Sequence, residues 1–111
     1  MQERCYFCTR KHLGYAEAFM QEAINGYPLH KWLAVGQLCA AEGEIMCDHP
    51  EMAQMIREHR VKYIDDMHYE VPILDLIEKV TLLASQFEEH SDDVKYASEY
   101  GIDEEINEEN E

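Results

Sequence analysis

The feature that most constrains this chain is how rarely its sequence interrupts regular structure. Its 111 residues include only 5 glycines and 3 prolines. These residues break helices and strands, so long uninterrupted segments are expected. Between the breaks, apolar residues recur every three or four positions, which is the spacing of one helix face. No alternating strand pattern and no internal repeat is visible.

The breaks divide the chain into five predicted helices. Asn25-Gly26 ends the first helix, and a proline at a first-turn position begins each of the next three. The predicted ranges are Arg4 to Ile24, Pro28 to Cys47, Pro50 to about Met67, Pro72 to about Phe87, and a short helix from Asp92 to Tyr100.

These helices predict an all-α fold. The connection between the first two is so short that they are expected to lie antiparallel. We therefore predict an antiparallel helical hairpin extended to a four- or five-helix bundle. Residues 1–100 are expected to form a single helical domain, and residues 101–111 an acidic, flexible C-terminal tail.

The apolar spacing also predicts which face of each helix is buried. The second helix carries its apolar and small residues at Leu29, Trp32, Leu33, Gly36, Cys39, Ala40, Gly43, Met46 and Cys47. A glycine inside a helix costs up to about 1 kcal/mol, so these glycines indicate close packing against the first helix. For the other helices the predicted inward residues are Cys5, Cys8, His12, Tyr15, Ala16, Phe19 and Ala23, then Met52, Met55, Ile56, His59, Tyr63 and Met67, then Ile73, Leu76, Ile77, Val80, Leu83, Ala84 and Phe87.

The net charge narrows the choice of partner. Lys and Arg total 9 against 24 Asp and Glu, which gives a formal charge of -15. Nucleic acid and anionic membranes are not expected as direct partners, because each phosphate contact needs a basic side chain. A protein with a basic surface is the expected partner, and homo-oligomer formation is left open. The simpler interpretation is that the acidity serves solubility alone.

The chain lacks the apolar run of a secretory signal at residues 1–5 and the roughly 20 apolar residues of a membrane span. A cytoplasmic location is therefore expected. In that reducing compartment, the 4 cysteines are expected to bind metal or stay free rather than form disulfides.

A cluster near the N-terminus has the spacing of metal ligands. Cys5, Cys8 and His12 are three and four residues apart, so a helix places them on one face. Thiolate and imidazole are the ligands that zinc prefers, and a structural zinc site needs four of them. Equal rise along the two helices of the hairpin brings the end of the second helix opposite Cys5. His49 is the preferred fourth ligand, with Cys47 as the alternative, and His30 and Cys39 fit less well.

Two other interpretations of these cysteines remain open. Buried cysteines on an apolar face are often simply small hydrophobic residues. A redox-active pair at Cys5 and Cys8 is the third interpretation, although a thioredoxin-type motif follows a strand. With four protein ligands the metal would be structural, because catalysis needs an open coordination position.

No catalytic motif is recognisable, so an enzyme is the less favoured interpretation. The sequence contains no phosphate-binding glycine loop and no Gly-x-Ser-x-Gly. The carboxylates at Glu17, Glu22, Glu42 and Glu44 are interpreted as a solvated face, because their spacing does not fit a dimetal site. The alternative function is a small-molecule or nucleotide-binding protein, with a pocket near His12, His30 and Trp32.

Three stretches resemble short uncharacterised proteins of tailed bacteriophages. They run from Cys5 to Leu13 (CYFCTRKHL), from Gly26 to His30 (GYPLH) and from His49 to Arg60 (HPEMAQMIREHR). The resemblance implies no known activity and carries no catalytic residue across. It implies a small protein made in the host cytoplasm during infection, which acts by binding a host protein. We therefore predict an acidic helical interaction protein with a structural zinc clip.

Overall fold

The computed structural model describes residues 3–88, and it describes side chains for residues 6–86. Within that range the chain forms four helices and no strand: α1 (Glu3–Ile24), α2 (His30–Ile45), α3 (Pro50–Asp65) and α4 (Ile73–Glu88). The predicted all-α bundle is confirmed. The predicted fifth helix, Asp92 to Tyr100, and the tail, residues 101–111, lie outside the described residues.

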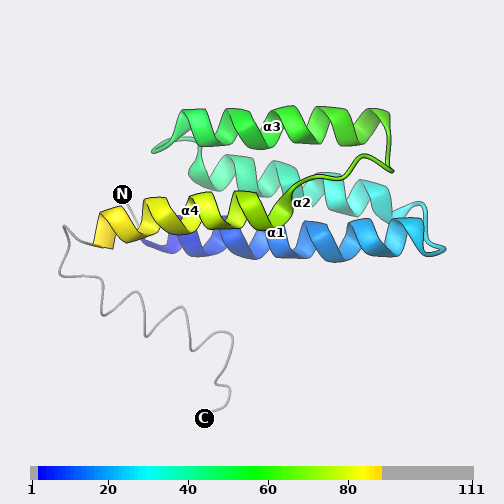
Figure 1. The fold of residues 1–111 in the computed structure, drawn as a ribbon, viewed down its shortest axis with the longest axis horizontal. Coiled ribbons are helices and arrows are strands. Elements are labelled where there is room, and N and C mark those ends of the chain that lie inside the picture. The colour runs from blue at the N-terminus through cyan, green and yellow to red at the C-terminus, as the bar shows by residue number, and fades with distance from the viewer. Residues whose placement is uncertain (1–2, 89–111) are drawn as a thin grey trace, which may run out of the picture.

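Successive helices run in opposite directions, and α1 and α2 form the central pair (Figure 1). The α3 helix packs against α2, and α4 packs against α1. In the view of Figure 1, α3 lies above α2 and α4 crosses in front of α1. The predicted antiparallel hairpin is therefore the part of the fold to which the other two helices attach. None of the four described helices combines the length and apolar character that a membrane-spanning helix requires.

Local sequence explains where the helices end. Gly26 has a φ of 122°, a left-handed conformation that glycine adopts without penalty. The amide of Tyr27 then donates to the Glu22 carbonyl at 3.0 Å and closes the end of α1. Pro50 occupies the first turn of α3, where its missing amide is not needed. The α2 helix begins at His30, two residues after the predicted Pro28.

The core forms where the four helices meet. The predicted inward faces of α3 and α4 are largely confirmed, with buried side chains that include Met52, Ile56 and Tyr63, and Ile73, Leu76, Val80 and Ala84. In α1 the prediction is right for Ala16 and Ala23 and wrong for Tyr15, which is 49 % exposed. The buried side chains are Tyr6, Thr9, Leu13, Ala16, Met20 and Ala23, and the predicted Cys8, His12 and Phe19 are only half-buried. The packed face of α1 therefore centres on Leu13 rather than on the cysteine-histidine face.

In α2 the predicted face is wrong. The buried side chains are Ala34, Leu38, Ala41, Glu42 and Ile45, on the opposite side of the helix from the predicted set. Small buried residues such as Ala34 and Ala41 let a helix lie close to two neighbours, α1 and α3. Because α2 is apolar on both sides, its larger side chains indicated the wrong face.

Candidate functional site

The four predicted metal ligands lie near one end of the hairpin, but the described contacts do not bring them into one cluster. Cys5 is in the first turns of α1, and its side chain is outside the described set. Cys8 is half-buried and forms no disulfide. The alternative fourth ligand, Cys47, is exposed.

His49 lies where the hairpin geometry places it, beside the start of α1. Its Nε2 atom shares a hydrogen bond of 3.0 Å with the Tyr6 hydroxyl, and the two ring centroids are 5.8 Å apart. Its Nδ1 atom lies 3.7 Å from a carboxylate oxygen of Glu51. The start of α3 is thus held against the residue that follows Cys5.

His12 lies further along the hairpin. Its Nδ1 atom is 2.6 Å from the side-chain oxygen of Gln37 in α2. Tyr6 and His12 are six residues apart on α1, a rise of roughly 9 Å. His49 is held at the level of Tyr6 and His12 by Gln37 further along the hairpin, so one of the two imidazoles would have to reorient to share a metal ion with the other.

Among the described residues, no group of three or more His, Cys, Asp or Glu side chains is placed to hold a metal ion. Cys5, whose side chain is outside the described set, is not among these residues. In a site built from Cys5 and Cys8, His49 would bind the metal through Nδ1 if Nε2 keeps its hydrogen bond to Tyr6. The zinc clip through Cys5, Cys8, His12 and His49 remains a prediction.

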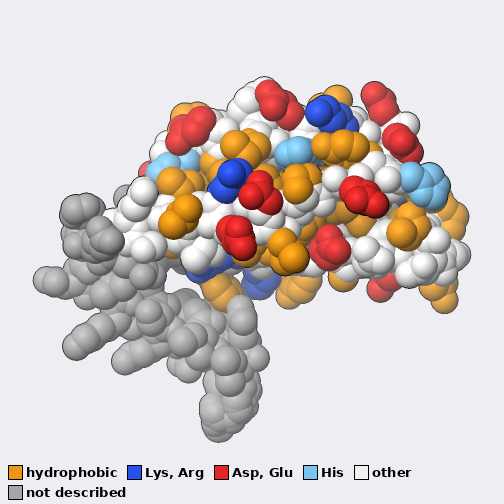
Figure 2. Space-filling model, viewed as in Figure 1, with side chains coloured by type: hydrophobic (Ala, Val, Ile, Leu, Met, Phe, Trp, Pro, Cys, Tyr) orange, Lys and Arg blue, Asp and Glu red, His pale blue; other side chains and the backbone are white. Residues whose placement is uncertain are grey.

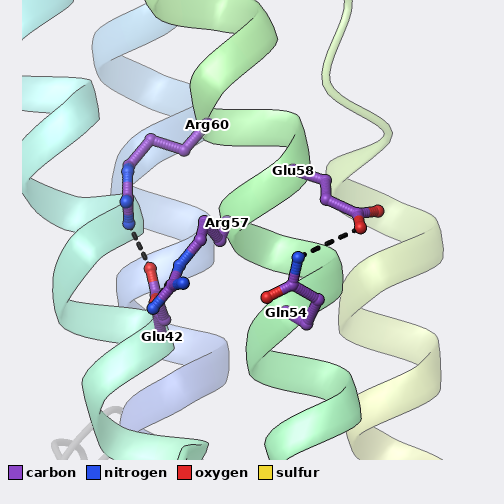
Figure 3. Close-up of polar contacts among 5 residues, drawn as sticks. All are labelled: Glu42, Gln54, Arg57, Glu58 and Arg60. Atoms are coloured by element: carbon purple, nitrogen blue, oxygen red, sulfur yellow. Dashed lines mark hydrogen bonds and ion pairs between the residues drawn. The ribbon is translucent and has the colours of Figure 1, made fainter.

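A buried carboxylate joins α2 to α3, and sequence reasoning missed it. Glu42 was predicted on a solvated face, but it is 5 % exposed. Arg57 donates to it from Nε at 2.9 Å and from Nη2 at 2.8 Å, and Arg60 donates to its other oxygen (Figure 3). Both arginines come from α3 and are three residues apart, which places them on one face of that helix. The cluster neutralises its buried charge internally and acts as a structural clamp.

A second polar contact ties α3 to the segment before α4. His59 Nδ1 lies 2.7 Å from the Tyr69 hydroxyl, and the two rings are stacked. Burial lowers the pKa of His59 below its ordinary 6.5, and the nearby Lys62 lowers it further. Lys62 also sits over the Tyr69 ring at 5.7 Å. A neutral imidazole therefore helps to hold this segment in place.

The structure has a pocket of about 500 Å³ where the ends of α1 and α3 meet the segment before α4. It is lined by Glu17, Met20, Gln21, Ile24, Tyr63, Met67, His68, Tyr69, Glu70 and Val71. Of these, Tyr63 is fully buried, its hydroxyl has no hydrogen-bond partner among the described residues, and burial raises its pKa above 10.0. The pocket is not the one predicted near His12, His30 and Trp32. Trp32 is 56 % exposed, and His30 is paired with Glu22 at 2.5 Å.

The side of α2 that points away from the core is apolar, and no other helix of the described residues covers it. This outward face of α2 comprises Leu29, Trp32, Leu33, Gly36, Cys39, Ala40, Gly43, Met46 and Cys47, and all except the half-buried Ala40 are exposed. Leu29 and Met46, just beyond the ends of the helix, keep helical backbone angles and so continue the face. None of these residues is charged, although the chain has a net charge of -15, and the Lys31 ammonium lies over the Trp32 ring, 5.1 Å from its centre.

The surface elsewhere is mixed and more acidic. On the side drawn in Figure 2, over α3 and α4, acidic side chains are scattered among apolar ones, and basic side chains are fewer. Comparisons with protein-family models, with curated proteins and with solved structures find no match.

Proposed function

We propose that this chain is a small interaction protein that acts by binding other proteins. The observation that carries the proposal is the outward face of α2. Leu29 is 77 % exposed and Trp32 56 %, and no charged residue interrupts the face. A helix that is apolar all round is typically buried, so one whose second face is open is expected to be covered by another protein.

The charge of the chain suggests the chemistry of its functional partner. An acidic surface attracts a basic one over a distance of about one Debye length, roughly 8 Å at physiological ionic strength. Such attraction speeds encounter more than it adds to affinity. We propose that α3 and α4 present the acidic surface to a basic protein. The resemblance to tailed-bacteriophage proteins makes a host protein in the bacterial cytoplasm the proposed target.

The test is capture of a partner from bacterial lysate at low and at physiological salt. The wild-type chain is compared with a Glu58→Lys, Glu78→Lys variant, which alters α3 and α4. A Glu17→Lys, Glu22→Lys variant of α1 makes the same change in net charge. A protein that is recovered by the wild type and by the α1 variant, but lost with the α3–α4 variant, supports the proposal. Recovery of no protein at either salt concentration contradicts it.

The pocket favours a second candidate, the binding of a small molecule. Its wall combines methionine and tyrosine side chains with carboxylates and an amide, which suits a ligand with both apolar and polar groups. A ligand present at a hundred times its dissociation constant stabilises the folded state by about 2.7 kcal/mol. Thermal denaturation with a panel of metabolites would reveal such a ligand. An Ile24→Glu variant, which places a charge in the pocket wall at an exposed position, should lose the response.

A further inference from the structure

Building on the proposed function, which treats the outward face of α2 as an interface, we infer that a second copy of this chain covers it. The two α2 helices pack antiparallel about a twofold axis that passes between Cys39 and Ala40. The occupant is thus this chain itself, and the pair is a homodimer.

Packing within the described part of the chain does not explain the glycines of this face. A Cβ atom added at Gly36 or at Gly43 would meet nothing within 4 Å, so no neighbour in the described structure requires a glycine there. Glycine nevertheless weakens a helix interior. Its presence at two exposed positions of one apolar face is explained if another backbone approaches closely there.

The order of residues along this face is complementary to the same face of a second, antiparallel copy. In an antiparallel pair centred between Cys39 and Ala40, residue n of one helix lies level with residue 79 minus n of the other. Gly36 then lies level with Gly43 of the other copy, and this relation holds at both ends of the contact. Such self-complementarity is what an isologous twofold interface requires.

The larger side chains then fall beside suitable partners. With 100° of rotation per residue, Trp32 and Met46 lie on the same edge of the face. Across the twofold axis, Trp32 of one copy lies level with Cys47 of the other, one residue from Met46. The flexible thioether of Met46 can therefore pack on the indole of Trp32 in the other copy. Leu33 meets Cys47 on the opposite edge in the same way. The bulky contacts lie at the ends, and the glycines allow close approach near the middle.

The direction of pairing also has an electrostatic reason. The first turn of α2 has no acidic residue and its last turn has no basic one, so neither pole of the helix dipole is offset by its own side chains. An antiparallel neighbour brings opposite poles together. It also brings Asp48, just beyond the end of one α2, level with the N-terminal end of the other.

The exposed area is sufficient for a dimer, at the lower end of the range. The four large side chains of the face are 43–77 % exposed. With up to about 150–250 Å² for each when fully exposed, and with the smaller residues included, the outward face offers roughly 600 Å² per copy. Two copies would bury roughly 1,200 Å², which is where stable interfaces begin. Two chains of charge -15 also repel each other. The dimer is therefore expected to tighten as salt is added, whereas binding to a basic partner weakens.

Dimerisation would leave α3 and α4 of both copies accessible. A basic partner with two binding sites, or two partners held together, would then meet two acidic surfaces at a fixed separation. Binding both at once raises the overall affinity without any new contact. The dimer thus supplies the geometry in which the proposed function operates.

The first test measures mass in solution by light scattering over a range of protein concentration. The wild type should have the mass of two chains, and Gly36→Leu should raise the dimer dissociation constant by about tenfold or more, because an inserted side chain separates the helices. Gly14→Leu on α1 is the matched control, because Gly14 is also exposed with nothing within 4 Å. It should leave the dimer unchanged. A wild type of single-chain mass at all concentrations, or equal effects of the two variants, overturns the inference.

The second test fixes the register by oxidation with oxidised glutathione, which accepts the two electrons and leaves as two reduced molecules. Two Cys39 residues would flank the axis with Cα atoms roughly 6 Å apart, within the range of a disulfide. Two Cys47 residues, fifteen positions apart along the pair, would be separated by roughly 22 Å. Both cysteines are exposed. Cys39→Ser should abolish the cross-linked dimer and Cys47→Ser should retain it, and the reverse result overturns the antiparallel register.

The outcomes separate the dimer from the proposed function. A single-chain mass together with partner capture that depends on α3 and α4 refutes the dimer and retains the function. A dimer that captures no protein refutes the function and retains the dimer.

Discussion

Glu42 offers a sharp test of how the bundle is held together, because its carboxylate bonds two arginines of α3. Glu42→Gln keeps the volume of the side chain but removes its charge. The new side-chain NH2 group, a hydrogen-bond donor, also faces the N–H donors of an arginine where a carboxylate oxygen accepted before. A hydrogen bond to a charged group contributes about 1.5–3 kcal/mol, against about 0.5–1.5 kcal/mol for a neutral pair. The substitution therefore weakens every bond of the clamp in Figure 3.

The two arginines contribute unequally to the expected loss in the free energy of unfolding. The side chain of Arg57 is 50 % exposed and can turn to water, whereas Arg60 is 18 % exposed and cannot do so fully. Most of the loss therefore arises at Arg60. We expect Glu42→Gln to lower the free energy of unfolding by about 2 kcal/mol, below the 3–5 kcal/mol of a fully buried broken pair.

The assay is urea denaturation followed by circular dichroism, at a concentration at which the oligomeric state is the same for all variants. Glu78→Gln is the matched control, because Glu78 is an exposed carboxylate of α4. It should change the free energy of unfolding by no more than about 0.5 kcal/mol. Equal losses for the two variants would refute the reasoning, since the buried carboxylate would then contribute no more than an exposed one.

Three further predictions concern other side chains. Tyr63→Phe removes a buried hydroxyl that has no partner among the described residues. In urea denaturation the variant should be as stable as the wild type or up to about 1 kcal/mol more stable. If its free energy of unfolding is instead lower by more than that amount, the hydroxyl makes a stabilising hydrogen bond. The pKa of His59 in the folded chain lies below 6.5, mainly because of burial, so the unfolded chain binds protons first as the pH falls. Stability should therefore decline from pH 6.5 downward to that lowered pKa, and His59→Gln should lack this part of the decline; identical pH profiles would contradict it. If the zinc clip forms, mass spectrometry of the untagged protein should find about one zinc per chain, lost in Cys5→Ser and in His49→Ala; a metal-free wild type would contradict the clip.

The sequence predicted α3 and α4 well because most apolar residues of each helix fall on one side, although Val61, Leu74 and Leu82 are exposed outside that side. A period of three to four residues then identifies both the helix and the face that it buries. The turn at Gly26 was also predictable, since glycine alone adopts the left-handed conformation without strain. These two helices and this turn depend on residues that are close together in the sequence, so the local sequence pattern predicts them.

The buried face of α2 could not be predicted in this way. Both sides of the helix are apolar, so periodicity does not choose between Leu38 and Leu33. The choice depends on α1 and α3, which need small residues such as Ala34 and Ala41 where the three helices meet. The buried Glu42 was missed for a related reason: its arginine partners lie 15 and 18 residues further along the chain, and only the packing of α3 brings them to it.

The candidate site was predicted in part. Antiparallel pairing of α1 and α2 correctly brings His49 to the start of α1, because helix rise fixes the register of a short hairpin. The position of His12 against Gln37 depends on side-chain rotation, which spacing does not determine. The pocket beside Tyr63 depends on how residues 66–72 cross the end of the bundle, and no motif indicates that path.

The central claim is that the outward face of α2 is an interface, and Trp32 reports on it directly. Trp32 is the only tryptophan of the chain and lies on this face. We would measure its fluorescence emission over a thousandfold dilution, for the wild type and for Gly36→Leu. The account predicts blue-shifted emission from a buried indole in the concentrated wild type, moving to longer wavelength on dilution, and long-wavelength emission at every concentration in the variant. Long-wavelength emission from the wild type throughout would show that the face stays in water and would contradict the account.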